Sequence, residues 1–419
     1  MAPIEFAADD PFDVAGLNLT PSPRAREVRA ELVNFMNTEV FPAESVYHAY
    51  RAAQHPSDHS LPPVVEELKE KARERGLWNL FLPAVSGVSN LDYASLAEIT
   101  GWSLDLAPEA INGQAPDTGN MELLHLFGTD EQKKRWLDPL LNATIRSVFA
   151  MTEKDVASSD ATNIETTMVR DGNEFVINGR KWWASGAADD RMQLYIVMGK
   201  TDVTAPKHLQ QSMVLVPRGT SGVTVVRDLP VFGRHDQHGH CEVLFENVRV
   251  PVSNLLGLEG HGFAMAQARL GPGRIHHCMR ALGAAERAMA LMVDRAHSRV
   301  AFGKPLADQG MVQRDIGESR LAITQARLLC QHAAAVIDAR GNKAAARLIA
   351  QAKVTVPRVA LDVIDRAIQI HGGAGISDDV PLAAMYGWHR AMRIFDGPDE
   401  VHLRSIALSE RLEKSNLRP

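Results

Sequence analysis

Hydrophobic and polar positions follow two different periods along the chain, in three successive regions. From about Pro21 to Leu141, segments such as PRAREVRAELVNFMNTEVF and PPVVEELKEKARERG place apolar residues three and four positions apart. That spacing is the period of an amphipathic helix. Short runs that contain Pro, Gly and Asp separate these segments. A helical first region is therefore predicted.

From about Ser147 to Leu256 the period changes to that of strands. The chain here carries short runs rich in β-branched and aromatic residues, broken by Gly, Asn and Asp, and such runs favour β-structure. They are EFVINGRKWWAS, QLYIVMG, SMVLVP, GVTVVRD and CEVLFENVRV. A β-domain is predicted.

After Gly260 the helical period returns in long Ala- and Leu-rich segments, which predict a helical bundle. The pair GG at 372–373 is expected to end one helix, and SDDVPL to begin the next. The fold class is therefore an α+β multidomain protein. Its domains are expected to be an N-terminal helical domain over 1–146, a central β-barrel or sandwich over 147–256 and a C-terminal four-helix bundle over 257–419.

The composition is that of a packed protein without a membrane span. Of 419 residues, 45% are hydrophobic and 23% are charged, which allows a sizeable core. The longest apolar runs, LYIVM at 194–198 and MVLVP at 213–217, are far shorter than the roughly 20 residues that cross a bilayer. The first residues, MAPIEFAADDPFD, lack the basic start and apolar centre of a secretory signal and are too acidic for a typical transit peptide. We expect a cytoplasmic protein, with an organellar matrix or peroxisome left open.

Cysteine spacing and charge exclude further classes. Cys241, Cys278 and Cys330 lie far apart and form no CxxC pair, so neither a disulfide framework nor a thiolate metal site is indicated. The net charge is −6, from 45 basic and 51 acidic side chains that are well mixed. A sequence-independent grip on nucleic acid is therefore not expected.

Several polar or aromatic motifs are ambiguous on their own. MTEKDVASSD at 151–160 has hydroxyls and irregular backbone that suit a ring edge or a phosphate, but a simple polar turn is the better interpretation. In NGRKWWASG, Trp182 and Trp183 are adjacent in a predicted strand and should face opposite sides of the sheet. One would then belong to the core, while the other could cover a ligand.

Histidine-rich positions are given structural interpretations. HDQHGH at 235–240 resembles a metal cluster, yet a solvated loop is the favoured interpretation, and no metal site is expected. His276 and His277 adjoin Arg274, so one of them could face a functional cavity, but both are interpreted as helix-surface or packing residues.

The stretch RIFDGPDEVH, 393–402, contains a helix start with an acid before it. Pro398 suits the first helical position, and Asp399 and Glu400 favour the positive end of the helix dipole. Asp396 sits outside that helix. The pattern alone leaves open whether Asp396 ends a turn or points at a ligand.

Five motifs in one order make a family resemblance specific. MTEKDVASSD, NGRKWWASG, SRVAFGKPL at 298–306, QIHGGAG at 369–375 and FDGPDEVH together resemble the acyl-CoA dehydrogenase family across nearly the whole chain. The WW pair and the DGPDEVH ending are similar to the branch that also forms the dehydrogenase portion of larger eukaryotic fusion proteins. The resemblance implies an FAD enzyme that removes an α-proton from an acyl-CoA and passes the β-hydrogen as hydride to flavin N5. The product would be a trans-2-enoyl-CoA, as in fatty acid β-oxidation.

The resemblance also implies roles for individual residues. Asp396 occupies the position of the usual catalytic Glu, and Gly397 leaves room for the thioester. A second group of relatives carries its base just before an Arg that matches Arg274, but here the preceding residue is Gly273. Asp is one methylene shorter than Glu, so its substrate must approach closer to the backbone. The implied substrate-binding residues are Ser159, Gly271, Arg274 and Gly397.

The implied FAD site is divided between two subunits. Glu400 stands where relatives often have a Gln that touches FAD. Arg299, Phe302, Gln369, Gly372 and Gly373 match residues that reach the FAD of a neighbouring subunit. The remaining implied FAD contacts are Met151, Thr152, Ser159, Trp183, Ser185, Pro398 and Glu400.

The partners implied are an acyl-CoA, an electron-transferring flavoprotein and further copies of the chain, as a dimer of dimers. The acyl chain length is not readable, because it depends on how the helix around 94–101 packs. Two alternatives remain: a flavin oxidase resembling nitroalkane oxidase, and a DNA-binding relative without turnover. Oxygen consumption would favour the first, and salt-sensitive DNA binding the second.

Overall fold

The computed structural model describes residues 18–416, with side chains to residue 410. The stretch MAPIEFAADDPFD, on which the expected compartment partly rests, lies outside the described residues. The described residues form two compact units. The helical unit comprises 87–104 and the described parts of 1–34 and 274–419, and the sheet unit comprises 35–86 and 105–273.

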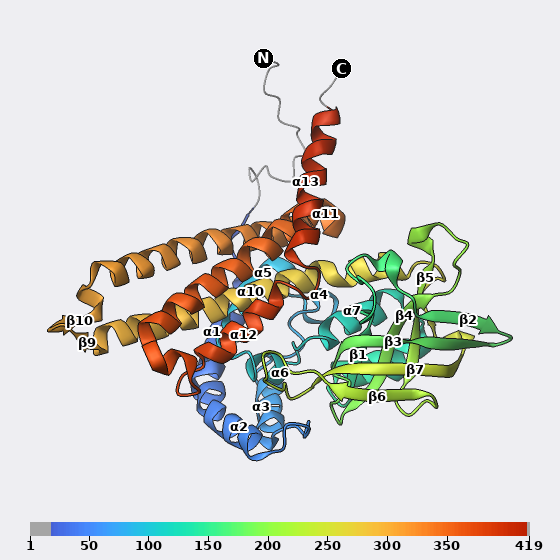
Figure 1. Ribbon diagram of the computed structural model, residues 1–419, viewed down its shortest axis with the longest axis horizontal. Coiled ribbons are helices and arrows are strands. Elements are labelled where there is room, and N and C mark those ends of the chain that lie inside the picture. Colours follow the sequence, from blue (N-terminus) through green and yellow to red (C-terminus); the bar gives the residue numbers. More distant parts are fainter. Residues whose placement is uncertain (1–17, 417–419) are drawn as a thin grey trace. The chain divides into compact units, whose positions relative to one another are not determined.

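The sheet unit is built on one eight-stranded mixed sheet (Figure 1). In spatial order the strands are β6 (Val223–Asp228), β7 (His240–Pro251), β3 (Glu174–Ser185), β2 (Thr167–Asp171), β4 (Met192–Lys200), β5 (Gln211–Pro217) and β8 (Leu255–Leu256). β1 (Arg146–Ala150) pairs in parallel with β4. The five runs predicted as strands are found in β3, β4, β5, β6 and β7. Apolar side chains from these strands, including Phe175, Val197 and Phe245, form the buried core.

Apart from the first residues of α10 (Gly262–Ser298), the α-helices of this unit precede the sheet in the chain. A capping box starts α8, because the Thr129 side chain accepts from the Gln132 backbone while Gln132 bonds back to the Thr129 backbone. Helical turns here are π- or 3₁₀-helical in places. The α-helices are α2 (Phe41–Ala53), α3 (Pro63–Glu74), α4 (Pro83–Ser86), α6 (Ala107–Ala110), α7 (Asp117–Phe127), α8 (Asp130–Gln132) and α9 (Asp138–Leu141).

A bulge in β3 changes which face its last residues occupy. Ile177 and Lys181 are buried, and the pairing with β7 then shifts register between Lys181 and Ala184, where Trp183 has φ 53°. The extra residue makes Ala184 the next buried position. Trp182 and Trp183 therefore both lie outside the core, with ring centroids 5.6 Å apart. The prediction that they face opposite sides of the sheet is wrong, because it assumed unbroken alternation.

The helical unit contains α1 (Pro23–Phe35), α5 (Asn90–Thr100), α11 (Gly310–His371), α12 (Leu382–Met392), α13 (Asp399–Asn416) and, from Arg274 on, α10 (Gly262–Ser298). The chain reverses direction within α11 at Gly341 (φ 81°), as Figure 1 shows. The two halves lie side by side, since Arg366 Nη1 donates to Ser319 Oγ at 3.1 Å. Gly372, with φ 63°, ends α11 as predicted.

A short hairpin of β9 (Val300–Ala301) and β10 (Lys304–Pro305) joins α10 to α11. Among the described residues, no helix combines the length and apolarity that a membrane span requires.

Candidate active site

Asp396 lies in the turn between α12 and α13, in a strained backbone conformation. Its φ is 55°, and Gly397 follows with φ 99°. A residue with a Cβ pays roughly 1–2 kcal/mol for the left-handed region, so the surroundings must hold it there. A Cβ at Gly397 would lie 2.7 Å from Nε2 of His402, which explains the glycine.

Cationic and imidazole side chains from three helices hold this turn through its backbone carbonyls. Arg274 Nε, from α10, donates to the carbonyl of Asp396 at 2.8 Å. Lys353 Nζ, from α11, donates to the carbonyls of Met392 at 2.6 Å and Phe395 at 2.9 Å. His402 Nε2, from α13, donates to the carbonyl of Asp396 at 3.3 Å. The backbone is thereby fixed independently of the Asp396 carboxylate.

Burial and neighbouring charges lower the pKa of each basic side chain that holds this turn. Burial, followed by the nearby cations Arg274 and Lys353, lowers the pKa of His402 to about 4, so the ring is neutral at physiological pH. Burial also lowers the pKa of Lys353 and of Arg274, while Asp396 opposes that shift in both. The carboxylate of Asp396 thus faces a positive environment.

His277 adjoins the Asp396 carboxylate. Its Nε2 lies 3.6 Å from Oδ2 of Asp396, and the two side chains are 16% and 22% exposed. The imidazole also meets the ring of Phe395 edge-on, with centroids 5.4 Å apart. His277 follows Arg274 by three positions, so both lie on one face of α10. Of the two histidines that adjoin Arg274, His277 therefore packs against Phe395 and also faces the carboxylate of Asp396.

The start of α13 is occupied by its own carboxylate. Asp399 is buried and accepts from Arg393 at 2.7 Å and from Arg358 at 3.0 Å. Burial opposes ionisation, but these arginines hold the pKa of Asp399 below its usual value. The helix begins at Asp399, so Pro398 immediately precedes it, and Glu400 is exposed.

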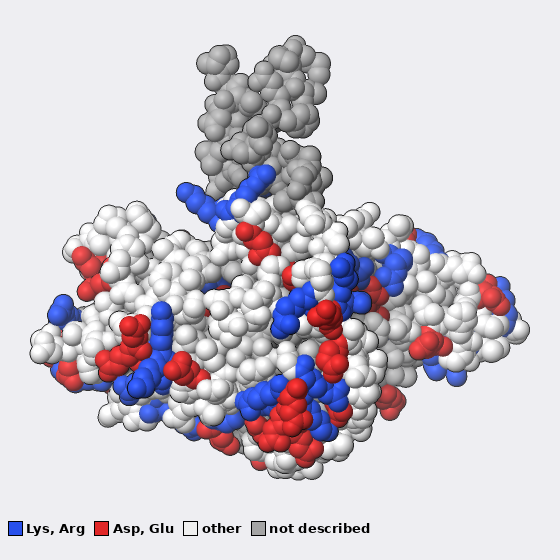
Figure 2. All heavy atoms as spheres, turned by 180° about the vertical axis from the view of Figure 1, so that it is seen from behind, with Lys and Arg blue, Asp and Glu red and all other residues white. Residues whose placement is uncertain are grey.

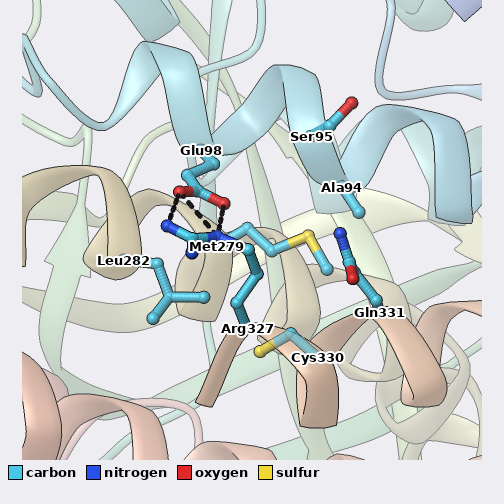
Figure 3. Close-up of a pocket in the computed structure, with 8 residues that line it drawn as sticks. All are labelled: Ala94, Ser95, Glu98, Met279, Leu282, Arg327, Cys330 and Gln331. Carbon is cyan, nitrogen blue, oxygen red and sulfur yellow. Dashed lines mark hydrogen bonds and ion pairs between the residues drawn. The ribbon is translucent and has the colours of Figure 1, made fainter. Parts of the chain in front are cut away.

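A shallow depression lies where α5 packs in the helical unit. Figure 3 shows the ion pair of Glu98 with Arg327 among its lining side chains. The depression has no room for a water molecule, so it is not a ligand pocket. The close approach of α5 to α10 is set by glycines: a Cβ at Gly101 would lie 2.0 Å from the Arg280 carbonyl oxygen.

In the sheet unit, Glu153 organises the segment that contains Met151 and Thr152. Its carboxylate accepts from Lys181 Nζ at 2.8 Å and from the Thr166 backbone at 3.0 Å. Lys181 is fully buried and also donates to the Met151 carbonyl at 3.0 Å. Burial lowers the pKa of Lys181 to about 8, against the opposing effect of Glu153.

The outer face of β3 presents aromatic surface beside this segment. The Trp182 backbone N–H donates to the Thr152 carbonyl at 2.7 Å, and Trp183 is 37% exposed. The indole N–H of Trp182 is shielded from solvent and has no hydrogen-bond partner among the described residues. Ser185 follows at the end of the strand, half-buried, whereas Ser159 is exposed.

The histidine-rich segment is packed rather than solvated, so the solvated-loop interpretation is wrong. His240 is 6% exposed, and its Nδ1 lies 2.8 Å from Ser185 Oγ. Its Nε2 lies 2.6 Å from Oδ2 of Asp236. One donor atom each of Asp236, His238 and His240 lies within 4.8 Å of the others. Hydrogen bonds within the protein account for both nitrogens of His240.

The residues matched to a subunit interface are exposed. Arg299 begins the β9–β10 hairpin and Phe302 forms its tip, where the Phe302 side chain is completely exposed. Gln369, Gly372 and Gly373 are exposed at the end of α11. Val300 on the same hairpin is also exposed, at 60%, and a surface on which exposed apolar side chains adjoin is a candidate for contact with another protein.

No sequence motif indicated Lys353, His402 or the contact of His240 with Ser185. His402 could have been found, because it lies one turn after Pro398 on the helix that follows Asp396. Lys353 is an unremarkable lysine in an Ala-rich helix. Nothing local signals its contact with the turn.

Comparison with solved structures defines the fold. An acyl-CoA dehydrogenase family structure from Mycobacterium abscessus superposes with TM-score 0.91 and 47% identity, covering 95% of this chain and all of that one. Butyryl-CoA dehydrogenase from Megasphaera elsdenii shares the fold, with TM-score 0.79 and 24% identity over 94% of this chain and 99% of that chain. The predicted fold class is confirmed.

Comparison with sequences defines the family. The family models for the N-terminal, middle and C-terminal domains of acyl-CoA dehydrogenase match residues 22–144, 148–248 and 260–410. FadE2 of Mycobacterium tuberculosis, described as a probable acyl-CoA dehydrogenase, is 65% identical over 94% of this chain and 97% of that protein. The chain belongs to the acyl-CoA dehydrogenase family, whose members are oxidoreductases acting on CH–CH donors.

The predicted branch is confirmed as well. Acyl-CoA dehydrogenase family member 11 of Homo sapiens is 50% identical over 95% of this chain but only 52% of that protein. The chain thus spans about half the length of these larger relatives.

Proposed function

We propose that this protein is an FAD-dependent acyl-CoA dehydrogenase in which Asp396 removes the α-proton of the thioester. The observation that supports it is the Asp396 turn. Its strained backbone is held by hydrogen bonds to carbonyl oxygens, while the Asp396 side chain that carries the carboxylate is 22% exposed. A base must be reachable and fixed in orientation, and the partial exposure of the carboxylate and the hydrogen-bonded backbone of the turn support both requirements.

Each residue of the turn and its surroundings would have a separate role in proton abstraction. Asp396 accepts the α-proton on a carboxylate oxygen, and Gly397 permits close approach of the substrate. Arg274 and Lys353 keep the turn rigid and favour the carboxylate form by their charge. His402 remains neutral and adds no competing charge. A shorter acid than Glu requires the α-carbon to lie nearer the backbone of the turn.

The residues of the sheet unit fit a flavin. The exposed face of Trp183, the unpartnered N–H of Trp182 and the hydroxyl of Ser185 offer stacking area and hydrogen bonds to a polar ring. Bound FAD supplies the hydride acceptor. Met151 and Thr152, whose carbonyls already bond within the protein, would contact its ring edge through their remaining groups.

We also assign the exposed hairpin and the end of α11 to a subunit interface. Arg299, with Phe302 beside it, would reach FAD bound to a second copy, and Gln369, Gly372 and Gly373 would adjoin its adenine end. An interfacial cofactor requires at least a dimer, and a dimer of dimers is proposed. Electrons would pass to an electron-transferring flavoprotein.

The test is an anaerobic absorbance titration of the yellow protein with short, long and branched acyl-CoAs. The wild type should be bleached by one class, while Asp396→Asn should retain FAD but bleach at least about 100-fold more slowly. Asp396→Glu keeps a carboxylate and tests reach, and Asp365→Asn removes an exposed carboxylate on α11 as a control. Unchanged bleaching by Asp396→Asn would overturn the assignment of the base.

The same preparation separates the alternatives. Oxygen consumption without an added acceptor would favour the oxidase. A DNA-binding relative would be expected to carry a continuous basic face; Figure 2 instead shows acidic and basic side chains interspersed on the face in view.

A further inference from the structure

Three side chains of the sheet unit form an unbroken line of hydrogen bonds. Ser185 ends β3 and His240 begins β7, and the two residues are direct partners in the antiparallel ladder. Ser185 Oγ lies 2.8 Å from His240 Nδ1, and His240 Nε2 lies 2.6 Å from Asp236 Oδ2. The line runs from a packed carboxylate to a hydroxyl on the outer face of β3.

The chemistry of the groups decides the direction of each hydrogen bond. An ionised carboxylate only accepts, so Nε2 of His240 must carry its hydrogen. In a neutral imidazole Nδ1 then has a lone pair and accepts. Ser185 has one hydroxyl hydrogen, which it must give to His240. Its oxygen keeps a lone pair that can accept a hydrogen bond from a third group.

The surroundings favour this arrangement. His240 is 6% exposed, and its backbone N–H donates to Asp228 at 2.9 Å. Burial opposes ionisation of Asp236, but the bond from His240 holds the pKa of Asp236 below its usual value. Other charged or titratable groups lie near the line. They include Arg51 and Tyr47 from α2, His59 and His235 at Asp228, Asp189, and His238, whose ring centroid lies 5.2 Å from that of His240.

We propose that Asp236 and His240 act as positioning residues that turn the Ser185 hydroxyl into a hydrogen-bond acceptor toward the flavin nitrogen that receives hydride. This inference rests on the proposed function. That nitrogen has a lone pair when the flavin is oxidised and carries N–H when it is reduced. A Ser185 oxygen that accepts therefore stabilises the reduced flavin over the oxidised flavin, and the line raises the reduction potential.

The test is the midpoint potential of the bound FAD, measured in the full-length holoprotein against a reference dye at pH 8, above the ordinary titration range of imidazole. Ser185→Ala should lower the potential by roughly three- to tenfold in the redox equilibrium, about 15–30 mV for a two-electron couple. Ser185→Thr keeps the hydroxyl and should restore the wild-type value. Equal potentials for wild type and Ser185→Ala would overturn the proposal.

A double-mutant cycle separates hydrogen-bond direction from charge. Asp236→Ala removes the acceptor that fixes the His240 tautomer, but it also removes a negative charge, which by itself raises the potential. The charge effect should be present in both backgrounds. Asp236→Ala is therefore compared in two backgrounds, one with Ser185 and one with Ser185→Ala. Its effect on the potential should be more negative in the background that keeps Ser185, and the difference should be a similar three- to tenfold factor in the redox equilibrium. Equal shifts in both backgrounds would contradict the relay.

The failures of the two proposals can be told apart. Dye equilibration does not need an acyl-CoA, so potentials remain measurable in a protein that no acyl-CoA bleaches. That result would overturn the proposed dehydrogenation. The double-mutant cycle would still test whether Asp236 and His240 position the Ser185 hydroxyl. A protein that binds no FAD would overturn both.

Discussion

The imidazole of His277 lies beside the carboxylate of Asp396, with 3.6 Å between Nε2 and Oδ2. Both side chains are partly exposed, so the imidazole can exchange protons with solvent while it contacts the proposed base. A positive charge on His277 stabilises the ionised form of Asp396.

Replacing His277 by Gln should make proton abstraction more sensitive to acid. Loss of a positive charge beside Asp396 lets this carboxylate take up a proton at higher pH, so the acid limb of the bleaching rate should move to higher pH. The measurement is the anaerobic bleaching rate between pH 5 and 9. His297→Gln, at an exposed position near the end of α10, should leave the limb in place. If the acid limb of the bleaching rate lies at the same pH in His277→Gln and in the wild type, the contact of His277 with Asp396 has no electrostatic effect.

Removing Glu153 should destabilise the sheet unit and weaken FAD binding. Glu153→Ala leaves Lys181 buried without its counter-ion, and breaking such a pair costs about 3–5 kcal/mol. It also frees the segment that contains Met151. Denaturant unfolding and FAD titration measure the two effects. Glu174→Ala, on the strand that carries Lys181, breaks an exposed pair with Arg249 of β7 and should cost less than about 1 kcal/mol. Similar losses for both variants would refute this ranking.

Gly283→Ala should open the contact between α5 and α10. The new Cβ would lie 1.9 Å from the carbonyl oxygen of Glu98, so the two backbones must move apart. Overpacking of this kind costs about 1–3 kcal/mol in the free energy of unfolding. Gly317→Ala, in α11, meets no atom within 4 Å and should gain up to about 1 kcal/mol from helix propensity. A thermal-shift comparison in which Gly283→Ala is as stable as Gly317→Ala would contradict the packing.

Acid should destabilise the helical unit through His389. Burial lowers the pKa of this residue to about 4, with Nδ1 donating to the Met385 carbonyl. Between about pH 6.5 and 4, His389 is protonated in the unfolded chain but neutral in the folded protein. The free energy of unfolding therefore decreases as the pH is lowered through this range. The loss from this residue at pH 5 is about 2 kcal/mol. His389→Phe should lose less stability than wild type between pH 7 and 5 in denaturant unfolding; equal losses would exclude this role.

Much of the architecture was predictable because it depends on local periodicity. The apolar spacing of three and four identified the helical regions, the β-branched runs identified the strands, and the glycine at 372 marked a helix end. The exception is β3, where strict alternation failed at Trp182 and Trp183. A bulge depends on how a partner strand pairs, and the sequence NGRKWWASG does not predict it.

The sequence by itself determined the family, the candidate base at Asp396 and the aromatic pair, because these are residues in recognisable order. Only the tertiary structure decided which side chains support them. Arg274 bonds a carbonyl 122 positions away, and Ser185 meets His240 at a separation of 55. Such contacts depend on helix packing and strand register, which arise from interactions across the whole fold and leave no periodic trace in the chain.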